Sequence, residues 1–286
     1  MSILKHLFRR GRPSDPPDTR DNSEDRRSAI YDDLHHNQIL QQDEANQYSA
    51  REILSRLFGH FRPRSVVDVG CGIGTWLAAA RDFGVTDVVG IEGDWLDKKL
   101  ARIPGHLITT LDLEKGFDLA RTFDLAICLE VAEHLSPESA TRFVESLTAH
   151  AGVILFSAAI PFQGGHHHVN EQFPDYWSNL FRGSGYQPVD FIRRAIWDDR
   201  SVLWWLRQNI LVFAKQELAT GDGPFAGLSQ GAGPLAIVHP EVYLAKLRSL
   251  QSLIEERDKL IALLGSGKPI SVEHGPDGEL KITAGP

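Results

Sequence analysis

Cysteine is scarce in this sequence, and its basic residues do not outnumber the acidic ones. Cys71 and Cys128 are the two cysteines among 286 residues, so a scaffold of several disulfides is excluded and a reducing compartment is favoured. Lysine and arginine total 30, aspartate and glutamate total 38, and the formal net charge is −8. This balance argues against a protein that grips nucleic acid through a broad basic face, so we do not expect nucleic acid as a partner.

Long apolar runs are absent as well. No stretch is long and apolar enough to span a bilayer, and no secretory signal pattern is visible, so a cytoplasmic location is expected. Residues 1–28 are dominated by Arg, Asp, Pro and Ser and are predicted to be a disordered tail. The first eight differ because apolar side chains recur at helical spacing beside basic ones: Ile3, Leu4, Leu7 and Phe8. Two interpretations remain open, a frayed tail and a weak anchor at the inner face of the membrane.

The most informative stretch is a strand-like run that leads into a glycine-rich turn. Residues 66–69 are Val-Val-Asp-Val, and Gly70, Gly72 and Gly74 follow at every second position. Because glycine has no Cβ, the backbone can turn tightly here and a ligand can approach it closely. The spacing is not the dinucleotide-binding G-x-G-x-x-G. In an open α/β sheet, ligands bind at the carboxyl ends of strands, so this turn is a candidate binding site.

Acidic residues stand at the ends of the strand-like runs that follow. Glu92 ends the run 87–91, and an acid at that place commonly holds a ribose diol. Asp112 and Glu130 follow two further apolar runs. The carboxyl ends of parallel strands share one edge of a sheet, so we expect these acids to lie near the glycine turn.

The alternation of strands and helices predicts an α/β fold, with a mostly parallel seven-stranded sheet and helices on both faces. Strands are expected at residues 65–69, 87–91, 106–110, 124–129, 152–157, 187–192 and 209–215. Helices are expected at residues 44–60, 75–84, 137–149 and 171–183.

The glycine turn, followed by acids after successive strands, resembles the class I S-adenosylmethionine (SAM)-dependent methyltransferases over about residues 45–215. The alternative is another nucleotide-binding α/β domain. The resemblance implies a Rossmann-like fold and SAM as the methyl donor, with the methionine part at the turn, the ribose at Glu92 and the adenine at Asp112-Leu113. The cofactor-binding residues that it implies are Asp68, Gly70, Cys71, Gly72, Gly74, Glu92, Asp112, Leu113 and Leu129.

A second group of polar residues follows the fourth and fifth expected strands. The sequence Glu130-Val-Ala-Glu133-His134 comes after one strand, and a glycine-flanked loop with three consecutive histidines, 166–168, comes after the next. Taken separately, these residues are typical of a helix cap, a surface acid and a solvated loop. Taken together, two carboxylates and two imidazoles form a ligand set for a divalent metal. Carboxylates favour Mg²⁺ or Mn²⁺, and imidazoles shift the preference toward Mn²⁺.

The E-x-x-E-H arrangement resembles two metal-dependent branches of the methyltransferases, which act on catechols of the ubiquinone pathway and on the 2′-hydroxyl of small RNAs. The segment 164–177 resembles bacterial methyltransferases of glycan pathways, in which a single histidine precedes Val-Asn-Glu, and His168 takes that place. The roles of His166 and His167 stay open. The implied metal ligands are Glu130, Glu133, His134 and His168, and the implied catalytic residues are Glu133, His134 and His168.

These features favour a metal-assisted O-methyltransferase that acts on a sugar hydroxyl in polysaccharide or related glycoside biosynthesis. A bound cation would lower the pKa of the hydroxyl and orient it. The alternatives are a catechol or RNA 2′-hydroxyl acceptor, and a scaffolding protein that has lost catalysis.

The C-terminal part has a different organisation. We expect a methyltransferase domain over residues 29–215, a Gly-, Ala- and Pro-rich linker over 216–238, a helix over 239–264 and a disordered tail over 265–286. The helix is either a coiled coil that joins copies of the chain or an amphipathic helix packed on its own domain. Its apolar residues alternate at three- and four-residue steps, with Arg257 as the exception: Tyr243, Leu247, Leu250, Ile254, Ile261 and Leu264.

Overall fold

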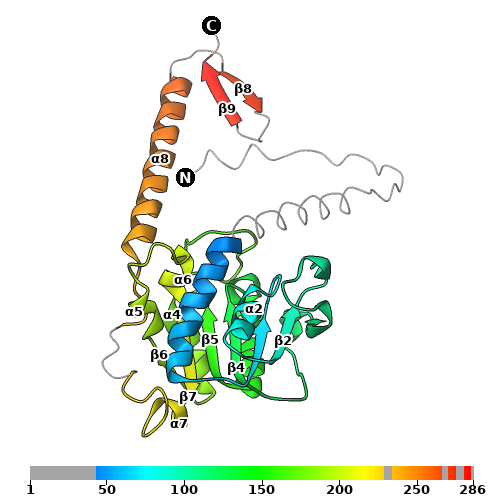
Figure 1. Ribbon diagram of the computed structural model, residues 1–286. Helices are drawn as coiled ribbons and strands as arrows, with labels where there is room; N and C mark the ends of the chain where they lie inside the picture. The colour runs from blue at the N-terminus through cyan, green and yellow to red at the C-terminus, as the bar shows by residue number, and fades with distance from the viewer. Residues whose placement is uncertain (1–42, 229–233, 266–269, 275–279, 285–286) are drawn as a thin grey trace. The chain divides into compact units, whose positions relative to one another are not determined.

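The computed structural model describes residues 43–228, 234–265, 270–274 and 280–284. Its main sheet has seven strands in the order β3-β2-β1-β4-β5-β7-β6 (Figure 1). β1 to β5 pair in parallel, whereas β7 pairs antiparallel with both β5 and β6, so the predicted mostly parallel sheet is confirmed. The strands are β1 (Ser65–Val69), β2 (Asp87–Glu92), β3 (Ile108–Thr110), β4 (Phe123–Leu129), β5 (Ala151–Ser157), β6 (Tyr186–Val189) and β7 (Leu211–Lys215).

The expected helices are also present, with boundaries that differ from the prediction by up to three residues. Residues 137–139 form a 3₁₀ turn, η5, before α3 begins, as is common at helix N-termini. The sequence did not predict the short helices α5, α6 and α7. The described helices cover residues 43–60, α2 (Thr75–Asp82), α3 (Ala140–His150), α4 (Pro174–Gly183), α5 (Ile192–Ala195), α6 (Trp204–Asn209), α7 (Gln216–Ala219) and α8 (Pro240–Gly265).

The middle of the sheet is covered on both faces. Four consecutive residues of β4, Leu125 to Cys128, are completely buried. Because successive side chains of a strand point to opposite faces, this run requires packed layers on both sides. Phe156 of β5 continues the core with edge contacts to Phe181 and Phe213, whose rings stack 4.0 Å apart.

The strand order changes direction between β1 and β4. From β1 the chain builds outward through β2 and β3, then returns to place β4 on the other side of β1. In such sheets the crevice beyond the carboxyl ends of these two strands is the place where ligands bind. The glycine turn follows β1 and the E-x-x-E-H segment follows β4, so both predicted motifs lie at this crevice.

The segment predicted as a linker, 216–238, contributes to the packed domain. It contains α7, and it buries Phe225 and Leu235. The ring of Phe225 lies 5.9 Å from that of Phe61 and 6.3 Å from that of Phe191. Its abundance of Gly, Ala and Pro hid these two apolar anchors, so the domain extends beyond residue 215.

The C-terminal tail, predicted to be disordered, contains an antiparallel pair, β8 (Ile270–His274) and β9 (Leu280–Ala284). Apolar residues alternate in both strands on either side of a Gly-Pro-Asp-Gly sequence, the pattern of a hairpin. The tail predicted over residues 1–28, with its membrane contact, lies outside the described residues. Within the described part of the chain, no helix has the length and apolar character needed to cross a membrane.

The packing of Phe225 gives a direct test of the domain boundary. Phe225→Ala should lower the free energy of unfolding by about 3–5 kcal/mol, because it removes a fully buried ring. Urea denaturation measures this change, and Asp222→Ala, in an exposed residue of the same segment, is the matched control. Equal stability of the two variants would show that the segment is a linker.

Candidate active site

The glycine turn after β1 has the backbone conformation that its sequence requires. Gly70, Gly72 and Gly74 all have positive φ angles, of 76°, 53° and 82°. A Cβ at Gly70 would lie 2.3 Å from Cγ2 of Val131, so this position must be glycine for packing. A Cβ at Gly72 would meet no atom within 4 Å. Gly72 is therefore the point of the turn whose backbone faces open space.

Glu92 is joined directly to this turn. Its Oε2 accepts a hydrogen bond from the N–H of Gly72 at 2.6 Å, and its Oε1 accepts one from the N–H of Gly93 at 2.8 Å. Burial raises the pKa of Glu92, and these two N–H groups lower it in part. Asp68 is also buried, and burial together with the charge of Glu92 raises its pKa. The structure thus brings the glycine turn, Glu92 and Asp68 close together.

Cys71 has a structural role in the same turn. A Cβ at Gly90 would lie 2.7 Å from its Sγ, so the thiol fills the space left by that glycine of β2. Burial raises the pKa of the Cys71 thiol, which keeps it protonated. Leu129, the last residue of β4, is half-buried. Because the Cys71 side chain packs against Gly90, Cys71 can contact a ligand only through its backbone.

A backbone hydrogen bond holds the segment that leads to Asp112 and Leu113 beside Glu92. The N–H of Leu111 donates to the carbonyl oxygen of Glu92 at 3.0 Å, which holds the end of β3 beside β2. The carboxylate of Asp112 caps the 3₁₀ turn η3 (Leu113–Lys115) and lies 2.8 Å from Nζ of Lys115, which lowers its pKa. Leu113 is half-buried against the core. Asp112 and Leu113 therefore have local partners within the chain, and their contact with adenine stays a prediction.

The sequence did not identify the contacts that hold helix 43–60 at this turn. The Oδ1 of Asp43 accepts hydrogen bonds from Oγ1 of Thr75 and Nε of Arg102, both at 3.0 Å. The Oδ1 of Asn46 accepts one from Nε1 of Trp76 at 3.1 Å. The bonds from Thr75 and Trp76 join the helix to the start of α2, immediately after the glycine turn. No local pattern could reveal them, because their partners are remote in sequence.

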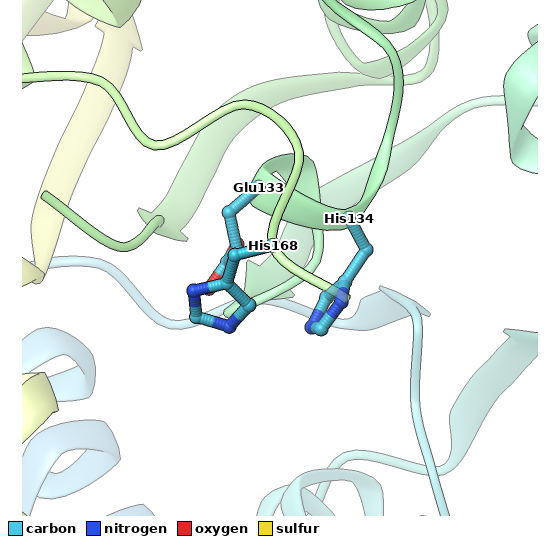
Figure 2. A group of neighbouring side chains, drawn as sticks. All are labelled: Glu133, His134 and His168. Atoms are coloured by element: carbon cyan, nitrogen blue, oxygen red, sulfur yellow. The ribbon is translucent and has the colours of Figure 1, made fainter. Parts of the chain in front are cut away.

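A second cluster lies after β4 and β5. Glu133 and His134 belong to the short turn η4 (Ala132–His134), and His168 lies on the loop after β5. One ligand atom from each of the three side chains lies within 4.8 Å of the others. Figure 2 shows the three side chains pointing to the same side, two from the turn and one from the neighbouring loop. The structure thus brings three of the four predicted ligands together.

Backbone hydrogen bonds fix the histidine loop to the turn. The carbonyl oxygen of Glu133 accepts the N–H groups of Val169 at 2.9 Å and Asn170 at 3.0 Å. These residues directly follow His168, so the imidazole is held next to the Glu133 carboxylate. His166 and His167, which precede it, are exposed and lie outside the cluster.

Glu171 orients the imidazole of His168. Its Oε1 lies 2.9 Å from Nδ1 of His168 and also accepts the N–H of Gly164 at 2.8 Å. A Cβ at Gly165 would lie 2.2 Å from Nε2 of His168, so this glycine provides the space that the ring needs. A proton held on Nδ1 by a carboxylate leaves the lone pair of Nε2 available to a ligand.

Glu130 lies outside the cluster, although the sequence predicted it as a fourth ligand. Its carboxylate accepts hydrogen bonds from Nδ2 of Asn209 and Nε2 of Gln163, both at 3.1 Å. Glu130 also has a positive φ of 54°, an uncommon conformation for a residue with a side chain. Asn209 and Gln163, which the sequence analysis missed, come from other elements, and no motif links them to Glu130.

Glu133 is the most unusual carboxylate of the site. It is completely buried, and neither of its oxygens has a hydrogen-bond partner among the described residues. Burial raises its pKa first, and the charge of Glu130 raises it further. A buried carboxylate without partners is costly unless a positive charge or a proton compensates it.

The family follows from a sequence comparison. The chain matches the family model of a methyltransferase domain over residues 42–208, which is more than half of its length. It belongs to the class I SAM-dependent methyltransferases. No curated protein is similar enough in sequence to be recognised as a relative.

Several solved structures are similar to this chain. DesVI of Streptomyces venezuelae is 15% identical with a TM-score of 0.50, and the match covers 65% of this chain and 98% of DesVI. The sugar N-methyltransferase KedS8 of a Streptoalloteichus species is 18% identical with a TM-score of 0.46, covering 73% and 98%. An O-methyltransferase family protein of Burkholderia thailandensis is 12% identical with a TM-score of 0.49, covering 64% and 59%. At 15% identity, the likeness to DesVI concerns the fold alone.

For this methyltransferase, the glycine turn gives the first test of the SAM site. Gly72→Arg should abolish SAM binding in calorimetry, because the new side chain would occupy the open space that the turn faces. Gly84→Arg is the matched control, since Gly84 also has a positive φ and open space around it, but lies after α2. Normal SAM affinity in Gly72→Arg would reject the assignment of the turn.

The pKa of Glu133 gives a second test. Because it is raised in the folded state, the unfolded chain ionises first as the pH increases, and the folded state then loses relative stability. In EDTA, Glu133→Gln should therefore raise the free energy of unfolding by about 1–3 kcal/mol near pH 8, and by less near about pH 5.

Urea denaturation at the two pH values measures this gain. Glu138→Gln, in an exposed residue of η5, removes the same charge from the surface and should change little. A Glu133→Gln protein that is less stable than wild type near pH 8 would contradict the electrostatic argument.

Proposed function

We propose that this methyltransferase transfers the methyl group of SAM to a sugar hydroxyl, with a divalent metal ion held by Glu133, His134 and His168. The observation that carries the proposal is the convergence of these three ligand atoms within 4.8 Å at the carboxyl edge of β4 and β5. The glycine turn occupies the same edge after β1, which β4 adjoins. SAM and the sugar hydroxyl would thus meet at the edge of the sheet from which both loops emerge.

The donor set suits such an ion. Glu133 offers two buried oxygens without partners, and His168 offers an imidazole whose other nitrogen is held by Glu171. A carboxylate behind a ligating histidine is a common arrangement in metal sites, because it fixes the ring and increases its basicity. One carboxylate and two imidazoles suit Mn²⁺ or another transition metal better than an all-oxygen site would.

The cluster favours a hydroxyl over an amine as the acceptor. A divalent ion lowers the pKa of an oxygen that it touches and orients it. A neutral amine is already a nucleophile, so it needs less help of this kind. The residues of the chain then contribute by holding the acceptor in line with the sulfonium of SAM, since methyl transfer depends strongly on position.

A sugar is favoured by the segment His168-Val169-Asn170-Glu171, which resembles bacterial glycan-pathway methyltransferases. In this chain each of its residues has a physical role. His168 belongs to the cluster, the N–H groups of Val169 and Asn170 bind the Glu133 carbonyl, and Glu171 holds His168. The segment therefore acts as a unit that positions one histidine at the acceptor side.

Metal removal separates the acceptor side from the SAM side. In EDTA, methyl transfer from labelled SAM should stop while SAM affinity persists, and added Mn²⁺ or Mg²⁺ should restore transfer. Glucosides, nucleotide sugars, a catechol and an RNA oligonucleotide are the acceptors to compare. His168→Ala and Glu133→Ala should each lower turnover by more than about tenfold with SAM affinity near wild type.

Calorimetry with Mn²⁺ alone tests the site independently of the acceptor. Wild type should bind the ion, the two alanine variants should bind it weakly, and His106→Ala, in an exposed histidine of η2 (Gly105–Leu107), should behave as wild type. Full transfer in EDTA would reject the metal, and His134 or His168 would then serve as a metal-free base. Transfer to the catechol or the RNA alone would reject the sugar.

A further inference from the structure

The C-terminal helix α8 presents an apolar face that its own domain does not cover. Within the described part of the chain, Val242 is the one residue of α8 that is buried. The six apolar residues of the heptad pattern are 40–63% exposed, and two other leucines are exposed beside them. The six are Tyr243, Leu247, Leu250, Ile254, Ile261 and Leu264, and the two are Leu244 and Leu253. An exposed apolar surface of this kind marks an interaction site.

The start of α8 is nevertheless firmly attached to the domain. The carboxylate of Glu241 lies 2.7 Å from Nη2 of Arg207, which is buried in α6. The N–H of His239 donates to Oε1 of Gln208 at 2.6 Å, and the ring of His239 bonds the carbonyl oxygen of Trp197 at 2.9 Å. The apolar face therefore begins at a fixed point. An alternative in which the helix folds back on its domain is not what the structure shows.

The spacing of the exposed residues indicates a second helix as the occupant. Apolar residues at alternating three- and four-residue steps form a seam that faces one partner helix. α8 has 26 residues and is about 39 Å long, and the seam extends over most of this length, which suits a partner helix of the same length.

The charges beside the seam favour an antiparallel copy of α8. In the first half of α8, Glu241 forms an ion pair with Arg207 of the domain. The remaining charged residues of that half, Lys246 and Arg248, are both basic. Residues 253–265 are net acidic, with Glu255, Glu256 and Asp258 against Arg257 and Lys259. An antiparallel pair places each basic half against an acidic half, whereas a parallel pair places like against like.

Arg257 supports the same orientation. It occupies a seam position, so a parallel pair in register would bring two arginines together. In an antiparallel pair with Tyr243 opposite Ile261, Arg257 lies opposite Leu247 instead. Its guanidinium also bonds Oδ1 of Asp258 within the same helix, at 2.8 Å. In the antiparallel pair, Arg257 therefore faces an apolar residue in one layer of the seam, and no two arginines repel each other.

We propose that α8 pairs in antiparallel orientation with α8 of a second copy of this chain, making the methyltransferase a homodimer. Light scattering of the full-length protein should give the mass of two chains. Leu250→Asp combined with Ile254→Asp should give the mass of one chain with SAM affinity unchanged, because these side chains lie on the exposed face. A single-chain mass for wild type would overturn the proposal.

The matched control adds the same two charges outside the seam. Ser249→Asp combined with Ser252→Asp changes exposed residues of the same segment and should leave the dimer intact. Loss of the dimer in this control as well would mean that charge alone disrupts it, and would overturn the assignment of the seam. A dimer that survives the Leu250 and Ile254 substitutions would also overturn it.

Disulfide crosslinking tests the orientation. The natural cysteines Cys71 and Cys128 are both buried, so a thiol introduced in α8 is the reactive one. Tyr243→Cys and Ile261→Cys, in chains of different tag length, should crosslink to each other after mixing and not to themselves. Self-crosslinking of each variant, without the mixed product, would overturn the antiparallel arrangement.

Discussion

The carbonyl oxygen of Glu133 accepts the N–H groups of both Val169 and Asn170, and the cluster of Glu133, His134 and His168 depends on these two bonds. They are possible because β4 and β5 run in parallel and adjacent, so that the loops that follow them leave the sheet at the same edge. The bonds join the backbone of the E-x-x-E-H turn to the backbone of the histidine loop. Glu171 then adds a side-chain connection within that loop, which orients the ring of His168.

Acidic side chains accumulate around this edge of the sheet. Asp68, Glu92, Glu130 and Glu133 are all held in surroundings that raise their pKa, chiefly through burial. The fold compensates Glu92 with backbone N–H groups and Glu130 with the amides of Asn209 and Gln163. Glu133 is left without such partners. A site of this character is suited to positive ligands, which include the sulfonium of SAM and the metal ion that we propose.

The two ends of the described chain show contrasting packing. Asp43 of helix 43–60 bonds Thr75, directly after the glycine turn, and Arg102, so this helix belongs to the side of the site that holds the turn. α8 is joined to the domain through Glu241 and then leaves its apolar face exposed. The first helix completes the fold of one chain, whereas α8 has the properties of a surface that a second chain completes.

The sequence by itself determined the alternating strands and helices of the α/β fold, the glycine turn and the acid of β2, because these depend on local periodicity and on glycine's freedom at positive φ. It also placed Glu133, His134 and His168 at one edge, since parallel strands align their carboxyl ends. It could not decide that Glu130 turns to Asn209 and Gln163, or that Phe225 anchors the segment predicted as a linker. Those outcomes depend on contacts between residues far apart in the chain, and only the packed tertiary structure brings such residues together.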